Sequence, residues 1–221
     1  HDALPIWKNR NNLHSFKSVI AYTRCTFTYK EAAMVQRITI APQGPEFSRF
    51  VMGYWRLMDW NMSARQLVSF IEEHLDLAVR LNQLVLIHTP HLEDKLKGTV
   101  MILSALKNRP DLDPCRVLVD HCEEHTFPLV KEAGYWAGLT LYPTSKLNPK
   151  RAADILELYG MDRVWANSAA DWGDSDPLAL TALACELRRR GFSRQETERL
   201  LLENPETFMG QSPKFRKVSS R

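Results

Sequence analysis

Three short apolar runs each end close to a residue that can bind a metal, and this pattern limits the folds open to the chain. The runs are 84–87, 117–119 and 164–166, and the candidate ligands after them are His88, His121 and Asp171 in that order. A parallel strand buried on both faces has such a continuous apolar sequence. Because α/β folds keep their chemistry at the carboxyl ends of parallel strands, the pattern predicts a metal site at one rim of a parallel barrel.

Strand and helix patterns alternate through most of the chain. Ser63 and Gln66 form a capping-box signature ahead of an apolar stripe, which predicts a helix over 64–81. Further strands are expected at 84–87, 116–120, 136–142 and 163–166, and further helices at 92–107, before Gly134, at 149–159, between Asp176 and Gly191, and from Ser193 through Leu202. Repeated βα units of this kind imply a parallel sheet with right-handed crossovers.

The N-terminal part of the chain has a different character. Residues 1–33 show no periodic pattern and are expected to form an unstructured or poorly ordered extension. Residues 35–40 and 48–52 alternate polar and apolar side chains around a turn at 43–45, which predicts a β-hairpin. The run 53–57 is expected to carry the second strand on to a barrel rim.

The chain length sets how much of a barrel can form. Its 221 residues allow one sizeable core but fall short of the about 250 residues of a complete eight-stranded barrel. The patterns supply about five or six barrel-type strands, whereas closure needs eight. The expected fold is therefore α/β, a partial or rearranged TIM-type (β/α) barrel with an N-terminal β-hairpin. Such an open sheet exposes an apolar edge, so self-association through that edge is expected.

Composition and charge argue against several classes of protein. The net charge is only +3, and basic residues are scattered apart from 188–190 and a short tail around 214–217, so a nucleic-acid-binding stripe is not indicated. The four cysteines show no paired spacing, which suits a reducing cytosol, and a cytoplasmic location is expected. No apolar stretch reaches the roughly 18 residues that span a bilayer, so no membrane partner is expected.

The residue types at the strand ends suit a divalent cation. Two imidazoles and a carboxylate are ligands that zinc and similar metals accept, and a bound ion lowers the pKa of a coordinated water. Asp171 could bind the metal or accept the proton from that water. Each position also has an ordinary structural interpretation: His88 as a hydrogen-bonded rim residue, Cys122 or His125 in place of His121, and Asp171 in a loop that caps a helix. The ordered set is more specific than any one member.

Residues 34–77 resemble the start of an aldo-keto reductase. The resemblance runs from Met34-Val35-Gln36-Arg37 through Gly53-Tyr54-Trp55-Arg56 to Leu77. It implies that the hairpin plugs the bottom of a barrel and that the Gly-Tyr-Trp-Arg stretch ends the first barrel strand beside a nicotinamide. The family continues with an Asp-x-Ala-x-x-Tyr-Gly motif that bears two catalytic residues, and no such string occurs here.

Residues 78–215 resemble the latter part of the TatD-like metal-dependent hydrolases. The matching strings are Leu86-Ile87-His88-Thr89, Asp120-His121-Cys122, the segment 167–173 and the segment 203–208, which resembles the family's C-terminal Glu-Asn helix. The resemblance implies that His88 and His121 bind one metal of a two-metal site, and that Asp171 serves the other metal and the attacking water. Members of the family cleave phosphoester bonds, often in DNA, or related hydrolysable bonds.

The metal site predicted by this resemblance is incomplete. The family opens with a His-x-His string and supplies a bridging Glu, and neither stands before His88. Two neutral histidines without an anionic bridge are expected to hold Zn, Mn or Mg weakly or not at all. Glu123 and Glu124 are the acidic residues nearest in sequence to the vacant bridging position, but their expected helical setting argues against that role.

Together these patterns indicate a chimera of two barrel fragments. The expected parts are an extension at 1–33, a reductase-like hairpin, strand and helix at 34–77, a hydrolase-like part at 78–215 and a tail at 216–221. The expected function is a TatD-type metal-dependent hydrolase acting on a small-molecule or nucleic-acid phosphoester. The alternatives are an NADP-dependent aldo-keto reductase and a non-catalytic fragment that self-associates.

Overall fold

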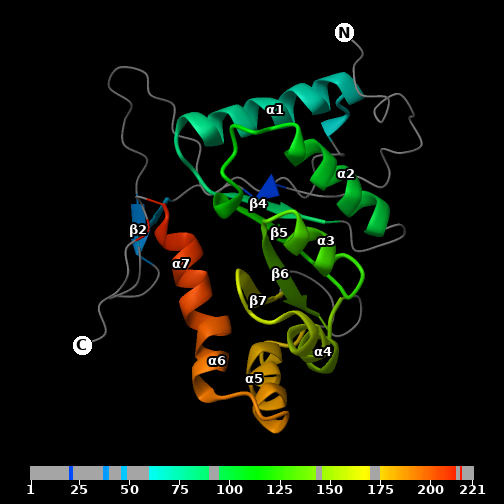
Figure 1. Ribbon diagram of the computed structural model, residues 1–221. Helices are drawn as coiled ribbons and strands as arrows, with labels where there is room; N and C mark the ends of the chain where they lie inside the picture. Colours follow the sequence, from blue (N-terminus) through cyan, green and yellow to red (C-terminus); the bar gives the residue numbers. More distant parts are fainter. Residues whose placement is uncertain are drawn as a thin grey trace.

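The computed structural model describes residues 20–21, 37–39, 46–48, 60–89, 95–142, 146–169, 175–212 and 215 (Figure 1). Its strands are β1 (Ile20–Ala21), β2 (Arg37–Thr39), β3 (Glu46–Ser48), β4 (Val85–His88), β5 (Val117–Asp120), β6 (Trp136–Leu141) and β7 (Val164–Ser168). Its α-helices are α1 (Ala64–Arg80), α2 (Lys95–Lys107), α3 (Phe127–Glu132), α4 (Pro149–Tyr159), α5 (Ala179–Arg189), α6 (Arg194–Glu198) and α7 (Asn204–Gly210). None of the helices in these ranges has the length and apolar character needed to cross a bilayer.

The main sheet has the strand order β1-β4-β5-β6-β7, and β4 to β7 are parallel. Each parallel strand therefore lies beside the next one in the chain, as successive βα units of a (β/α) barrel do. The short strands β2 and β3 pair antiparallel, so the expected hairpin forms, but β3 begins at Glu46, two residues before the strand expected from 48. The fold class predicted from sequence, a partial barrel with an N-terminal hairpin, is confirmed.

Helix boundaries follow the capping residues that the sequence offers. The Ser63 side chain accepts a hydrogen bond from the backbone of Gln66, whose side chain bonds back to Ser63, so α1 begins with a complete capping box. Asn148 caps α4 in the same way through the backbone of Arg151, and Pro149 occupies the first helical position. Gly160, with φ of 74°, ends that helix in a conformation that favours glycine.

Side chains from the two faces of the sheet enter two separate clusters. Val85, Val119, Leu139 and Val164 point into the larger cluster, which also contains buried residues of helices α1 to α5. The alternate residues face the other side, since successive side chains of a strand alternate between faces. There Leu118 and Trp136 form a smaller cluster with Phe208 of α7, and Leu86 and Trp165 pack against it.

Helix α1 crosses the expected boundary near residue 77 without a break. Leu67 and Leu75 on one side of that boundary and Ala78 on the other are all buried in the larger cluster. The helix of the reductase-like segment therefore packs on the sheet of the hydrolase-like segment, and both parts share one core.

The structure also departs from the sequence-based expectations. Ile20 and Ala21, in the region expected to be unstructured, form strand β1 and pair antiparallel with β4. The helix expected from Ser193 through Leu202 continues without a break, through a π-helical segment (Arg199–Glu203), into α7, where the resemblance of 203–208 implies a helix. The predicted strand at 51–55, and the rest of the 1–33 extension and the 216–221 tail, lie outside the described residues.

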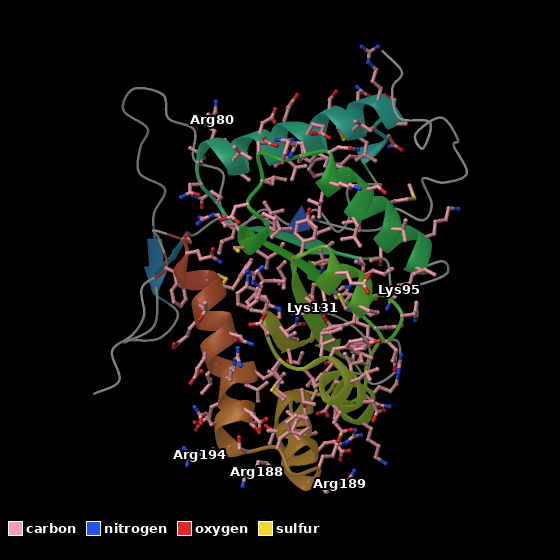
Figure 2. The ribbon with its side chains drawn as sticks, viewed as in Figure 1. Arg80, Lys95, Lys131, Arg188, Arg189 and Arg194 are labelled. Carbon is pink, nitrogen blue, oxygen red and sulfur yellow. The ribbon has the colours of Figure 1, made fainter. Side chains whose placement is uncertain are left out.

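The arginine run at 188–190 contributes to helix packing. Arg188, Arg189 and Arg194 lie at the end of the molecule formed by α5 and α6 (Figure 2). Arg189 and Arg190 both pair with Glu186, and Arg190 also bonds Asp154 and Glu157 of α4. This pairing ties the end of α5 to α4.

Candidate metal centre

The candidate site lies where β4 and β5 end. The strand register places His88 opposite Asp120, and His121 follows directly. One ligand atom from each of these three residues can be chosen so that all lie within 4.8 Å of one another. The two imidazole rings have centroids 4.5 Å apart, and His121 Nε2 lies 3.8 Å from Asp120 Oδ2.

Strand alternation places two members of this cluster above an apolar layer. His88 comes two residues after Leu86, and Asp120 comes two residues after Leu118. Both therefore share the sheet face that carries the smaller hydrophobic cluster, with Phe208 covering its amino-terminal end. The site consequently stands at the carboxyl ends of the strands, on the face that corresponds to a barrel interior.

Asp120 is held firmly in this cluster although it is buried. Its Oδ1 accepts hydrogen bonds from Thr140 Oγ1 at 3.0 Å and from Asn167 Nδ2 at 3.1 Å, and Asn167 also reaches Oδ2 at 3.2 Å. Space for the carboxylate comes from Gly138 on β6, because a Cβ there would lie only 2.8 Å from Asp120 Cγ. Three strands thus position one carboxylate.

The environment of Asp120 favours its ionised form. Burial by itself raises a carboxyl pKa, but the nearby His121 and His88 and the hydrogen bonds from the His121 backbone and Asn167 outweigh it, and the pKa of Asp120 is lowered. A negative charge is therefore available beside two imidazoles.

His121 is fixed in both backbone and tautomer. Its φ of 64° is left-handed, which is uncommon for a residue with a side chain. The hydroxyl of Thr89 donates to the carbonyls of Asp120, at 2.9 Å, and of His121, at 3.3 Å, which braces this turn. His121 Nδ1 lies 3.3 Å from the carbonyl oxygen of Thr89, and since a carbonyl only accepts, Nδ1 carries the hydrogen and Nε2 keeps its lone pair.

Burial keeps the His121 imidazole neutral. Desolvation lowers the pKa of His121 to about 3, and the neighbouring His88 and Lys146 act in the same direction, against the opposing effect of Asp120. A neutral imidazole is the form that binds a metal.

Lys146 also lies beside His121. Its Nζ lies 3.2 Å from His121 Nε2 and 5.6 Å from the ring centroid of Tyr142. Its backbone is anchored, since its N–H donates to the Tyr142 carbonyl and its own carbonyl accepts from Arg151 Nη1 at 2.8 Å.

The structure brings together two of the three residues singled out in the sequence. His88 and His121 meet, whereas Asp171 lies outside the described residues. Asp120, the acidic member of the cluster, was not among the predicted ligands. Its position in the sequence, at the end of an apolar strand and next to the candidate ligand His121, could have suggested it. Its orientation toward the site, however, depends on Gly138 and Asn167, which belong to other strands.

The other residues near His121 that could bind a metal do not join the His88–Asp120–His121 cluster. Cys122 is fully buried in the larger hydrophobic cluster, its thiol donates to the Val119 carbonyl, and burial raises its pKa. Glu123 pairs with Lys95, and Glu124 with Arg151. Together with the exposed His125 these glutamates form a separate group of potential ligands, so within the described residues Asp120, not Glu123 or Glu124, supplies the carboxylate beside His88 and His121.

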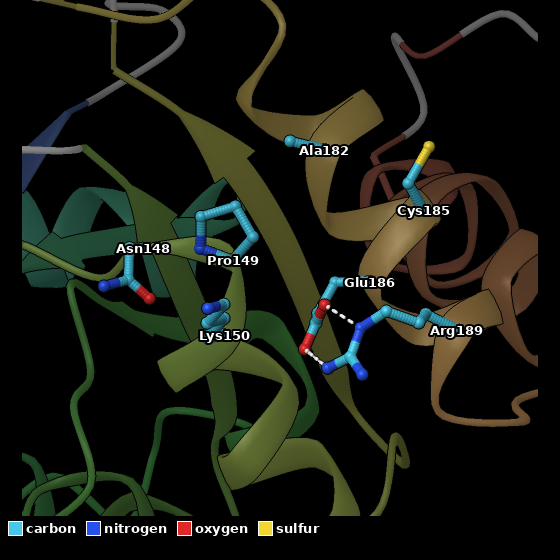
Figure 3. A pocket seen from close by; sticks show the side chains of 7 residues that line it. All are labelled: Asn148, Pro149, Lys150, Ala182, Cys185, Glu186 and Arg189. Carbon is cyan, nitrogen blue, oxygen red and sulfur yellow. Dashed lines mark hydrogen bonds and ion pairs between the residues drawn. The ribbon is translucent and has the colours of Figure 1, made fainter.

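A groove between α4 and α5 is separate from this cluster. It is lined by the start of α4, including Asn148, and by Cys185, Glu186 and Arg189 of α5 (Figure 3). Glu186 and Arg189 are paired with each other along the α5 side of this groove. None of its lining residues belongs to the cluster.

The donor set of the cluster fits a divalent cation. It consists of two imidazoles and one ionised carboxylate, which match zinc and related metals in ligand type. The hydrogen bonds from Thr140 and Asn167 to the carboxylate and the approach of His121 Nδ1 to a carbonyl are the kind of outer contact that orients metal ligands.

Comparisons with known proteins find relatives of two different kinds. Over 46 residues it is 98% identical to the oxidoreductase YdhF of Escherichia coli, a match that covers 21% of this chain and 15% of that protein. Over 91 residues it is 32% identical to the uncharacterized metal-dependent hydrolase MJ0761 of Methanocaldococcus jannaschii, covering 41% of this chain and 35% of that protein. No family model matches the chain.

A solved structure is similar to a larger part of the chain. It is the crystal structure of the TatD-like protein AF1765 from Archaeoglobus fulgidus, with 26% identity and a TM-score of 0.49 over 68% of this chain and 56% of that one. The resemblances predicted from sequence, a reductase in the N-terminal part and metal-dependent hydrolases in the rest, are confirmed, and a chimeric chain fits them. The chain spans only 15% and 35% of the lengths of the two curated relatives.

Proposed function

We propose that the chain is a metal-dependent hydrolase whose divalent cation is held by His88, Asp120 and His121. The observation that carries this proposal is the convergence of these three side chains at the carboxyl ends of β4 and β5. The similarity of this part of the chain to a metal-dependent hydrolase supports it. Asp171, outside the described residues, is proposed from the sequence resemblance to bind a metal and to take the proton from the attacking water.

Each described residue has a defined task in this proposal. His121 presents the Nε2 lone pair, because Nδ1 faces the Thr89 carbonyl. Asp120 contributes the negative charge that two imidazoles lack, and Asn167 and Thr140 prevent it from turning away. A divalent cation bound there supplies Lewis acidity and lowers the pKa of a coordinated water.

The proposed substrate is a phosphoester. The Lys146 ammonium beside His121 places a positive charge where an anionic substrate group would approach the site. An ammonium is a common partner of phosphate oxygens, so this charge supports a phosphoester over an uncharged ester.

Metal titration of the whole chain tests the proposal. Calorimetry with Zn²⁺ and Mn²⁺ is expected to show binding that is lost in the double variant His88→Ala and His121→Ala. His125→Ala is the matched control, because His125 is exposed and outside the cluster. Absence of binding by the unaltered chain, or loss of binding in His125→Ala alone, would contradict the proposal.

The reductase alternative rests on the near-identity with YdhF, which covers 46 residues. It needs a nicotinamide site, so titration with NADPH followed by fluorescence decides it. An unchanged NADPH emission over a micromolar to millimolar range of protein would remove this alternative.

A further inference from the structure

The Nε2 atom of His121 already has a partner in the protein. Because Nδ1 carries the hydrogen that faces the Thr89 carbonyl, Nε2 is an acceptor, and the Lys146 ammonium 3.2 Å away is a donor. The contact is therefore a charge-assisted hydrogen bond from Lys146 to the imidazole nitrogen.

A metal needs the same lone pair. An imidazole nitrogen has one lone pair in the ring plane, so it cannot accept from an ammonium and bind a cation at once. We propose that Lys146 is the internal cation of the metal-free site, and that a divalent cation must displace its ammonium from His121 Nε2. The inference rests on the proposed function and adds a step to it, namely competition between a residue of the chain and the metal.

The geometry allows this displacement without a change of fold. The backbone of Lys146 is fixed at both polar atoms, by the Tyr142 carbonyl and by Arg151, which is itself paired with Glu124. The four-carbon stem of lysine has enough rotatable bonds to move its ammonium by several ångströms. A side-chain rotation therefore suffices to clear Nε2.

The charges around the site predict how the loss of Lys146 changes the metal affinity. With no metal bound, the Lys146 ammonium is a positive charge close to the buried Asp120–His121 pair. When a cation of charge +2 arrives, that ammonium becomes a repulsive neighbour. Removing the Lys146 charge should therefore strengthen metal binding, whereas removal of a ligand would weaken it.

The test compares the metal affinities of two methionine variants. Lys146→Met keeps most of the aliphatic stem but removes the hydrogen-bond donor and the charge. Lys150→Met is the control: it makes the same change on α4, in the groove between α4 and α5, whose lining contains no residue of the metal cluster. Zn²⁺ calorimetry on the full chain should show binding about tenfold tighter in Lys146→Met, the equivalent of one charge-assisted hydrogen bond of about 1.4 kcal/mol. Lys150→Met should match the unaltered chain.

The outcomes separate this inference from the proposed function. If the unaltered chain binds zinc and Lys146→Met binds it equally or more weakly, Lys146 does not compete with the metal, although the proposed metal site is retained. If neither protein binds zinc, both the metal site and the competition are wrong.

A second readout needs no metal. In the metal-free protein, the ¹⁵N resonance of His121 Nε2 should move away from its hydrogen-bonded position in Lys146→Met and stay in place in Lys150→Met. Circular dichroism and a thermal melt establish that both variants are folded. A His121 Nε2 resonance that is the same in the folded Lys146→Met variant would overturn the inference.

Discussion

The carboxylate of Asp120 on β5 occupies the space that the absent side chain of Gly138 leaves on the neighbouring strand β6. A Cβ on Gly138 would lie 2.8 Å from Asp120 Cγ and 3.0 Å from its Cα. The second of these atoms belongs to the backbone, so the clash could not be relieved by side-chain rotation alone. The acidic group of the candidate metal site therefore depends on a glycine in another strand.

Gly138→Ala should disturb both the fold and the site. Overpacking of this kind costs about 1–3 kcal/mol, and here it also pushes Asp120 out of reach of Thr140 and Asn167. Urea unfolding should show the loss of stability, and calorimetry should show weakened zinc binding. Gly210→Ala is the matched control, because a Cβ there meets nothing within 4 Å. Equal stability and affinity in the two alanine variants would contradict the role of Gly138.

Asp120→Asn should weaken metal binding while it leaves the shape of the site unchanged. The substitution removes the negative charge from the donor set, so zinc affinity should fall at least about tenfold. Asp76→Asn makes the same chemical change on the exposed face of α1, in an ion pair with Arg109, and should leave the affinity unchanged. An Asp120→Asn variant that binds zinc as tightly as the unaltered chain would exclude Asp120 as a ligand.

Acid should weaken the ion pairs that Glu186 makes at the end of α5. Hydrogen bonds from Arg189 and Arg190 lower the pKa of Glu186 to about 2, from 4.5 in an unfolded chain. Because the folded pKa is the lower one, the stability gained from Glu186 is present above pH 4.5 and is lost as the pH falls through 2. Glu186→Gln should therefore lower Tm at pH 7 and make little difference near pH 2.

The comparison for Glu186 is Glu198→Gln, which removes an exposed pair with Arg194 on α6. Exposed helical pairs contribute little, so this variant should melt close to the unaltered chain at both pH values. A Tm difference between Glu186→Gln and the unaltered chain that is constant from pH 7 to 2 would contradict the assignment.

Phe208→Ala should destabilise the protein by about 3–5 kcal/mol. The Phe208 ring is fully buried and meets the rings of Trp136 and Trp165 edge to face, each with centroids 5.4 Å apart. Its removal should also shift tryptophan emission to the red, because water reaches the two indoles. Leu202→Ala, at a side chain that is 60% exposed, is the control and should change neither quantity. A Phe208→Ala variant with unchanged stability would show that α7 does not hold the smaller cluster together.

Local patterns were sufficient for most of the secondary structure. The capping residues Ser63 and Asn148 and the apolar runs at 84–87 and 117–119 depend on neighbours within a few residues, so helices α1 and α4 and strands β4 and β5 could be predicted closely. Strand β1 could not, because Ile20–Ala21 is a strand only through its pairing with β4. Helix α7 was expected from the resemblance of 203–208, but the burial of Phe208 depends on Leu84, Leu118 and Trp136, which lie far away in the sequence.

The candidate site was likewise predictable only in part. The positions of His88 and His121 at the ends of buried parallel strands could be predicted, since apolar periodicity and chain order indicate which residues stand at strand ends. The placement of Asp120 in the space at Gly138, and the contact of Lys146 with His121 Nε2, could not be predicted, because they exist only in the folded chain. These contacts join different strands and loops. Strand register and side-chain direction decide which residues meet, and neither can be read from a single segment of the sequence.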